Sequence, residues 1–202
     1  MSENSLERHE LNERDKKLCA HIAELVVNKD INTAEELFRL AIQILHINPE
    51  TVSLMRMWMK GSLRENHGLS PDNIPSFIQQ DNRAERNHEA QEQNWLDIMA
   101  EKLTNDIQNT CYKVDKKTIH IISTPETILG IVDESLGRAN TPEKKEILNK
   151  TIKNFELLGQ SCSFLAKITT PEEFHYFEML SILATQVIKI LSKFVKKNSK
   201  LN

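Results

Sequence analysis

"TPET" (residues 124–127), "TPEK" (141–144) and "TPEE" (170–173) have the same design, and "NPET" (48–51) is a fourth version of it. In each segment the side chain of Thr or Asn can accept a hydrogen bond from a free amide of the first helical turn. Proline suits the next position because its φ is fixed and the N–H that it lacks would have no partner there, while glutamate lies near the positive end of the helix dipole. The four segments therefore predict four helix starts, although Thr-Pro is also the pattern of a proline-directed phosphorylation site.

Apolar residues recur every three or four positions along most of the chain, which is the spacing of one helix face. The expected helices cover about 5–28, 33–45, 49–68, 95–112, 125–136, 142–167 and 171–197. Thr33 and Glu36 fit a capping box at the start of the second of these helices. Gly137 fits a left-handed cap at the end of the fifth.

The segments between these helices give little sign of a sheet. Residues 69–78 contain two prolines and predict a loop with a short helical turn, and "KVDKK" (113–117) predicts a turn. "TIHIIS" (118–123) looks locally like a strand, but we expect no partner strand for it and therefore irregular chain or a helical turn. The sequence thus predicts an all-α fold, an irregular multi-helix bundle of about six to seven helices.

"QQDNRAERNHEAQEQN" (79–94) has no large apolar side chain, and it also lacks Pro and Gly. Its Glu, Gln, Ala and Arg residues are good helix formers, whereas a disordered tether would more often contain Pro or Gly. We therefore interpret it as an exposed polar helical arm or connector. It would join an N-terminal helical lobe (1–78) to a C-terminal helical lobe (95–202), with one continuous domain as the alternative.

The composition is that of a soluble globular protein, with 39% hydrophobic and 27% charged residues among 202. Residues 1–100 hold 11 Lys/Arg against 17 Asp/Glu, and residues 101–202 hold 15 against 12, so the halves carry −6 and +3. A dedicated nucleic-acid binder needs concentrated positive charge, so we expect no nucleic-acid partner. The chain begins with no apolar stretch and has no long uncharged apolar run, so we expect neither a signal peptide nor a transmembrane helix.

Three cysteines, Cys19, Cys111 and Cys162, are far apart in the sequence and do not form a CxxC pair. They are typical of reduced, half-buried thiols, which favours a cytoplasmic protein. No G-x-S-x-G segment and no phosphate-binding glycine loop is present, so we predict a protein that is not an enzyme, with no catalytic residues and no cofactor. One weaker hypothesis remains for Cys111, since Lys113 could lower the pKa of its thiol.

Two Glu-x-x-His pairs, Glu85…His88 and Glu172…His175, have the spacing that ferritin-like di-iron proteins use on two of their helices. Such a metal site is lined by apolar residues inside a bundle, whereas Glu85 and His88 lie in the most polar part of the chain. Glu172 occupies the first turn of its helix, where glutamate is expected for capping alone. We therefore reject all four residues as metal ligands, and a small helical metalloprotein stays the second alternative.

"SLMRMWMKGSL" (53–63) places Met55, Met57, Trp58 and Met59 in several directions around one helix. They cannot all face one narrow core. Methionine adapts to irregular surfaces and tryptophan is frequent at interfaces, so we predict that these four residues bind a protein partner. Burial of this helix on most of its sides is the competing interpretation.

The C-terminal helix is apolar almost all round from Tyr176 to Val195 and ends in several lysines. This pattern favours the central helix of a bundle, with the lysines near the negative end of the helix dipole. Contact with a membrane or a partner through this helix is the less favoured alternative.

In composition, the chain is small, helical, rich in Asn, Lys and Ile and poor in Gly, with five glycines. In this respect it is similar to adaptor, chaperone and effector proteins of bacterial type IV secretion systems in intracellular pathogens. The similarity extends over the whole chain and no single residue carries it, so it implies no functional positions. We predict a non-enzymatic helical protein-interaction module, an adaptor or chaperone-like subunit associated with such a system. A secreted virulence effector that contacts a host protein or membrane is the first alternative.

Overall fold

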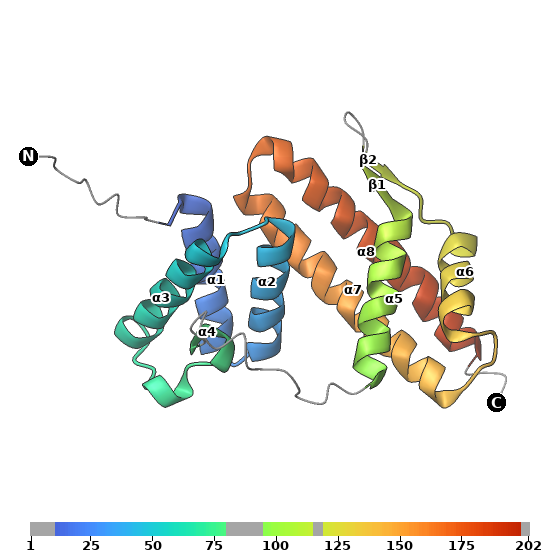
Figure 1. The fold of residues 1–202 in the computed structure, drawn as a ribbon, viewed down its shortest axis with the longest axis horizontal. Coiled ribbons are helices and arrows are strands. Elements are labelled where there is room, and N and C mark those ends of the chain that lie inside the picture. The colour runs from blue at the N-terminus through green and yellow to red at the C-terminus, as the bar shows by residue number, and fades with distance from the viewer. Residues whose placement is uncertain (1–10, 80–94, 115–118, 199–202) are drawn as a thin grey trace, which may run out of the picture. The chain divides into compact units, whose positions relative to one another are not determined.

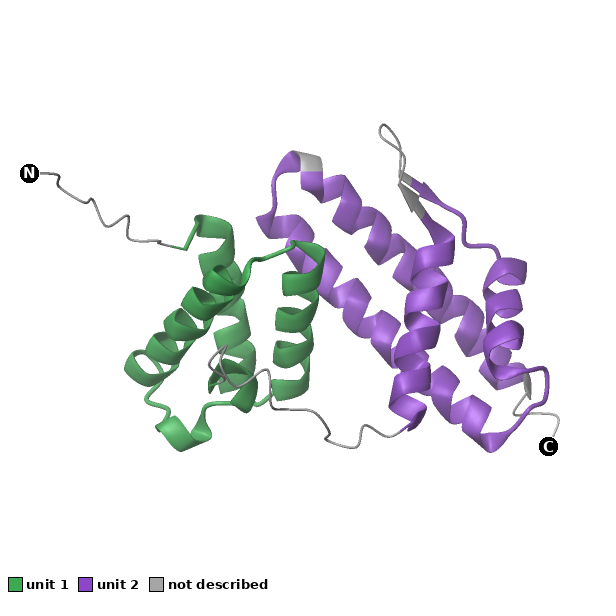
Figure 2. Ribbon diagram, in the orientation of Figure 1, with its two compact units in different colours: residues 1–89 green, residues 90–202 purple. Residues whose placement is uncertain are grey.

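A computed structural model describes residues 11–79, 95–114 and 119–198. The chain forms two compact units, residues 1–89 and residues 90–202 (Figure 2). The described residues are almost entirely helical, so the predicted all-α fold is confirmed. In chain order the elements are α1 (Glu13–Val27), α2 (Ile31–Ile44), α3 (Pro49–Glu65), a 3-10 turn η1 (Pro71–Asn73), α4 (Ser76–Gln79), α5 (Trp95–Cys111), β1 (Tyr112–Val114), β2 (Ile119–Ile121), α6 (Pro125–Leu136), α7 (Pro142–Ile168) and α8 (Pro171–Asn198) (Figure 1).

All four proline-led helix starts are confirmed. The side-chain oxygens of Asn48, Thr124 and Thr141 accept a hydrogen bond from the amide three residues later, at 2.8, 3.2 and 3.1 Å. Thr170 accepts the equivalent bond from the amide of Glu173 at 3.4 Å. Each bond satisfies an amide that has no partner within its own helix.

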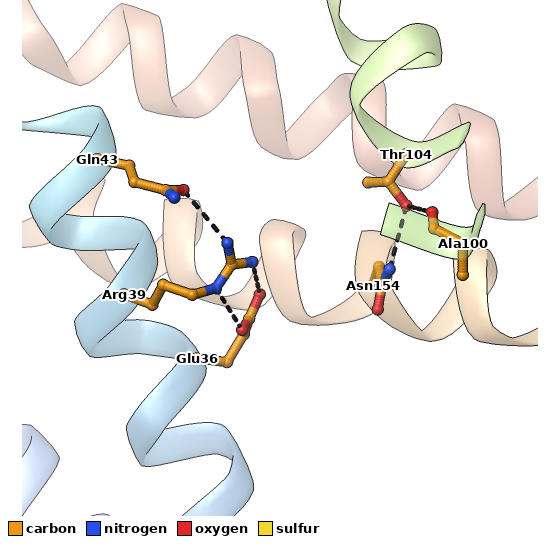
Figure 3. A network of polar contacts seen from close by, with 6 residues as sticks. All are labelled: Glu36, Arg39, Gln43, Ala100, Thr104 and Asn154. Carbon is orange, nitrogen blue, oxygen red and sulfur yellow. Dashed lines mark hydrogen bonds and ion pairs between the residues drawn. The ribbon is translucent and has the colours of Figure 1, made fainter. Parts of the chain in front are cut away.

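The first two helix starts differ from the prediction. α1 begins at Glu13 rather than near residue 5, because Asn12 caps it by accepting the amide of Asp15 at 2.8 Å. The capping box predicted at Thr33 is wrong. Asp30 is the cap of α2, and the Thr33 amide donates to its side chain. The Glu36 carboxylate instead pairs with the Arg39 guanidinium at 2.6 Å (Figure 3).

"TIHIIS" does contain a strand, so the expectation that it lacks a partner is wrong. β1 and β2 pair antiparallel, with Tyr112 opposite Ile121 and Val114 opposite Ile119. The partner strand lies directly after α5, in residues that the sequence assigned to a helix end and a turn. The two strands are close in the sequence, so this pairing is local, and β2 also packs on α8.

Unit 1 is built around α1, which packs against both α2 and α3 (Figure 1). Arg56 of α3 is buried beneath α4: its Nε donates to the Phe77 carbonyl at 3.0 Å and its guanidinium lies 5.7 Å from the Phe38 ring. The core side chains are Leu11, Leu18, Cys19, Ile22, Ala23, Val26, Ala34, Leu37, Phe38, Ala41, Val52, Met55, Met59, Leu63, Ile74, Phe77 and Ile78.

Unit 2 is organised by the pair α7 and α8, which follow each other with a two-residue link and lie side by side (Figure 1). Small residues allow this pair to approach closely, since a Cβ on Gly159 would lie 3.3 Å from that of Ala184. α5 packs on α7, where Asn154 donates to the Thr104 hydroxyl at 3.2 Å, and Thr104 donates to the Ala100 carbonyl at 2.7 Å (Figure 3). These bonds satisfy the polar groups that the α5–α7 contact covers.

A buried lysine joins three helices at one end of unit 2. Lys144, in the first turn of α7, donates to the carboxylate of Asp133 on α6 at 3.2 Å and to the carbonyl of Gly137. Its Nζ also lies 5.6 Å from the Phe194 ring of α8.

Gly137 ends α6, and its positive φ of +72° agrees with the predicted left-handed cap. Its ψ of 169° is extended, however, and this combination of φ and ψ is accessible almost only to glycine.

The predicted polar arm over 79–94 falls outside the described residues, apart from Gln79 at the end of α4. Whether the two units fold as separate lobes, as the division into 1–78 and 95–202 predicts, stays a prediction.

Candidate protein-interaction site

Helix α3 has a well-defined buried face. Val52, Met55, Met59 and Leu63 recur at intervals of three or four residues, and all four are buried in the core of unit 1. Met55 and Met59, two of the four predicted partner-binding residues, are therefore inaccessible to a partner in this structure.

The other two predicted residues lie on the outside of the same helix. Met57 is 67% exposed and Trp58 is 36% exposed. Each residue turns the helix by about 100°, so Met57 lies on the side opposite Met55 and Met59. Trp58 lies at the edge of the buried face, with part of its ring covered. We call these two exposed side chains the Met57–Trp58 ridge.

Beyond the ridge, the surface of unit 1 is hollowed. An open hollow of about 470 Å³ is lined by Gly61, Arg64, Glu65, Gly68, Leu69 and Pro71. Gly61 follows Trp58 by three residues and Met57 by four, so its position lies directly next to the ridge on the helix surface. A Cβ at Gly61 would have no atom within 4 Å. The absence of a side chain at this position therefore leaves the hollow open to the ridge.

The far wall of the hollow is held by hydrogen bonds, in addition to the buried side chains of Ile74, Phe77 and Ile78 that follow it. The Gln79 side chain donates to the carbonyls of Pro71 and Ile74, at 2.9 and 2.6 Å, and the Gln79 carbonyl accepts from Lys60 Nζ at 3.0 Å. The Leu69 amide donates to the Leu63 carbonyl at 3.0 Å, which closes the chain back onto the end of α3. Gly68 has φ +65°, which this reversal requires. The hollow is thus formed by the chain itself and needs no partner to shape it.

None of the rejected metal candidates comes together with another as a ligand set in the described residues. Glu85 and His88 lie outside those residues, and the side chain of Glu172 does too. His175 is exposed, and its Nδ1 lies 3.6 Å from the carboxylate of Glu178. Within residues 11–79, 95–114 and 119–198, no three His, Cys, Asp or Glu side chains are grouped so that they could hold a metal ion.

The three thiols are fully buried rather than half-buried, and all three are free in the structure. Burial raises the pKa of Cys162 to about 12, and burial together with the nearby Asp15 carboxylate raises that of Cys19 to about 12. Burial also raises the pKa of Cys111, so the hypothesis of a lowered thiol pKa there is wrong. A nucleophilic cysteine is a thiolate near neutral pH, and none of these environments favours one.

One face of α8 packs against α7 and the rest of unit 2. Phe177, Leu180, Leu183, Ala184, Val187 and Leu191 are all buried. Two of its large apolar residues, Phe174 and Ile182, are exposed, and Lys196 and Lys197 occupy its last turn. Within the described part of the chain, none of the helices has the length and apolar character needed to cross a membrane.

The four residues predicted to bind a partner include Met57 and Trp58 of the ridge together with the buried Met55 and Met59, and the sequence did not predict the hollow. Its walls come from the loop after α3 and depend on the return of that loop to the helix. One signal was present: a glycine inside an otherwise helical pattern indicates either a weak point or a place of close approach, and Gly61 is such a glycine.

The sequence matches no protein-family model, and neither a curated protein nor a solved structure is significantly similar to it. Functional conclusions therefore depend on the residues and geometry of the chain itself.

Proposed function

We propose that this chain is a non-enzymatic protein-interaction module that binds a protein partner through the outer face of α3. The observation that carries this proposal is the Met57–Trp58 ridge lying beside a hollow that the chain holds open with its own hydrogen bonds. A partly exposed tryptophan can serve as an anchor at an interface, because its burial by a partner contributes a large part of the binding free energy. The hollow offers the partner a shaped surface next to that anchor, with Arg64 and Glu65 at its rim.

Rigidity of the site supports the same proposal. The ridge lies on a 17-residue helix whose other face is buried, and the wall of the hollow is fixed by Gln79 and Lys60. A preformed surface loses little conformational entropy on binding, so more of the contact free energy remains as affinity. Such a surface would suit an adaptor or chaperone-like subunit. The composition of the chain resembles that of such proteins in bacterial type IV secretion systems.

Comparison of two tryptophan variants tests the proposal. The wild-type chain, Trp58→Ala and Trp95→Ala would each be immobilised and incubated with lysate from the source cells, and retained proteins would be identified by mass spectrometry. We expect a protein that is retained by the wild type and by Trp95→Ala but lost with Trp58→Ala. Trp95 is the matched control because it is also exposed but lies in unit 2.

The thermal melt of each variant decides whether such a loss is a binding effect. Trp58 is 36% exposed, so Trp58→Ala should cost about 1–2 kcal/mol of stability, below the roughly 3–5 kcal/mol for a fully buried aromatic residue. Equal retention of all proteins by the wild type and Trp58→Ala would contradict the proposal, and so would a collapse of the fold in Trp58→Ala.

A further inference from the structure

The outer face of α8 carries a stripe of four lysines, Lys189, Lys193, Lys196 and Lys197. Each residue turns a helix by about 100°, so these four side chains fall within an arc of about 100°. All four are exposed. The stripe extends over about 12 Å of helix, because each residue adds about 1.5 Å to its length. We call these four residues the α8 lysine stripe.

No acidic residue interrupts the stripe. Residues 179–198 of α8 contain no Asp or Glu. On the neighbouring helices, Asp133 and Glu146 pair with lysines of α7 instead. Glu134 of α6 and Glu143 of α7 form no ion pair with the stripe, and neither does any other carboxylate in the described part of the chain. The stripe is therefore a surface of one sign.

Helix capping accounts for only part of this pattern. Lysines near the carboxyl end of a helix interact favourably with its dipole, but the effect is confined to about the last turn. Lys196 and Lys197 lie in that turn. Lys189 and Lys193 lie further from the end of α8 at Asn198, beyond the reach of this effect.

The apolar face of α8 is already covered by its own unit. Val187 and Leu191 lie two positions before and after Lys189, so they point to the opposite side of the helix, and both are fully buried. α8 therefore cannot insert its apolar face into a bilayer while unit 2 stays folded. An approaching surface meets the lysines, together with the exposed Ile182 on the same side of the helix.

We propose that the α8 lysine stripe binds an anionic membrane surface, with α8 lying along the lipid headgroups and unit 2 still folded. Four or more lysines on one face of an amphipathic helix are typical of binding to anionic lipid. A protein interface is depleted of lysine and is centred on aromatic or arginine anchors, and the stripe contains neither. The inference concerns a surface of unit 2 and does not depend on the proposed function of α3.

The expected binding is weak, reversible and sensitive to salt. Each lysine close to an anionic surface strengthens membrane binding by about fivefold, so four lysines together contribute a factor of several hundred. This attraction falls off within the Debye length, which is about 8 Å at physiological ionic strength and about 3 Å in 1 M salt. Binding that depends on the stripe should therefore disappear at high salt.

Co-sedimentation of the full chain with lipid vesicles tests the proposal. Vesicles of phosphatidylcholine alone are compared with vesicles that also contain about 30% phosphatidylserine. We expect the chain to sediment only with the vesicles that contain phosphatidylserine, and to be released as the salt concentration rises towards about 1 M. Phosphatidylglycerol should replace phosphatidylserine without loss of binding, because the stripe responds to charge and makes no pocket for one headgroup.

Paired substitutions locate the binding surface. Lys193→Gln with Lys197→Gln removes two charges from the stripe and should weaken binding by about 25-fold. Lys193→Arg with Lys197→Arg keeps both charges and should bind as the wild type does. Lys17→Gln with Lys102→Gln lowers the net charge by the same amount at two exposed lysines outside α8, and should also bind as the wild type does.

Circular dichroism checks that each variant keeps its helix content. If the first pair loses helix at the end of α8, Lys189→Gln with Lys193→Gln replaces it, because these two positions lie away from the last turn. The same loss of about 25-fold is expected from this second pair.

Several results would overturn the proposal. These are no sedimentation with phosphatidylserine vesicles at low salt, equal sedimentation with phosphatidylcholine alone, or full binding by the glutamine variants of the stripe. An equal loss of binding with Lys17→Gln and Lys102→Gln would assign the attraction to net charge instead. Retention on poly-glutamate or duplex DNA without any binding to phosphatidylserine vesicles would reject the membrane and identify an acidic protein segment or a nucleic acid as the partner.

Discussion

Helices α3 and α8 present the same ambiguous pattern in the sequence, an apolar arc too wide for one narrow core, yet the structure uses them differently. In α8 the apolar residues are divided among several neighbours, because α7, α6 and β2 all pack against it. In α3 the neighbours are α1 and α4, and the side of the helix that faces away from α1 keeps Met57 and Trp58 exposed. The width of an apolar arc therefore does not decide burial. The elements that pack on each side of the helix decide it, since α8 has three neighbours and still leaves Phe174 and Ile182 exposed.

Glycines in the two units differ in the same way. Gly159 of α7 lies where a Cβ would approach Ala184 of α8 at 3.3 Å, so glycine there permits helix packing. Gly61 of α3 has no atom within 4 Å of that position, so glycine there leaves a surface open. Neither difference is visible in the local sequence, since both glycines interrupt otherwise regular helical patterns.

The largest expected difference between a buried and an exposed apolar side chain lies within α8. Phe177 is fully buried, and Phe177→Ala should lower the free energy of unfolding by about 3–5 kcal/mol through lost burial and the cavity left behind. Phe174, three residues earlier, is 38% exposed, and Phe174→Ala should cost about 1 kcal/mol or less. Urea unfolding followed by circular dichroism measures both. Equal effects would mean that α8 is not packed as described.

A second pair of substitutions makes the same comparison in α3. Met59→Ala should cost about 2–5 kcal/mol because Met59 is fully buried, whereas Met57→Ala should change stability by about 0.5 kcal/mol or less. A Trp95→Phe background leaves Trp58 as the sole tryptophan, so its fluorescence follows the unfolding of unit 1. If Met57→Ala were as costly as Met59→Ala, the ridge would be part of a core and the proposed function would lose its basis.

Leucine at the two glycines should separate a packed surface from an open one. Gly159→Leu overfills the α7–α8 contact and should cost about 1–3 kcal/mol. Gly61→Leu meets no atoms in its own chain and should stabilise α3 by about 0.5–1 kcal/mol, because glycine is a poor helix former. Thermal melts of the two variants should therefore shift in opposite directions. A destabilised Gly61→Leu chain would show that the hollow is filled.

The buried thiols predict a loss of stability in alkali. Cys19 and Cys162 have pKa values of about 12 in the folded chain, against 9.0 for an ordinary thiol. Above pH 9 the unfolded state releases these protons while the folded state keeps them, so the stability that burial of the neutral thiols provides is present below pH 9 and declines as pH rises towards 12. The slope for each thiol is on the order of 1 kcal/mol per pH unit.

Replacement of the thiols checks the origin of that slope. Cys19→Ala in unit 1 and Cys162→Ala in unit 2 should each reduce the loss of stability with rising pH. Urea midpoints measured between pH 8 and 11 would show the effect. A wild-type slope that is unchanged in both variants would assign the decline to other groups, such as Tyr112, whose pKa burial also raises.

The candidate site shows how far sequence reasoning extends. Periodicity alone separates Met57 from Met55 and Met59, because positions two apart lie on opposite sides of a helix. The prediction nevertheless named all four residues as partner-binding, and the structure buries Met55 and Met59 in the core. The hollow depends on Gln79 reaching back to Pro71 and Ile74, contacts between residues whose proximity no local pattern specifies.

Local chemistry determined the helices of this protein. An N-cap oxygen, a proline and a glutamate satisfy the first turn of a helix within four residues, so starts at Pro49, Pro125, Pro142 and Pro171 could be found from the sequence. Tertiary structure decided the complete burial of the three cysteines and the exposure of Trp58 beside an open hollow. These depend on which surfaces meet in space. The free energy of packing is a property of the pair of surfaces in contact, and a single stretch of sequence contains only one member of that pair.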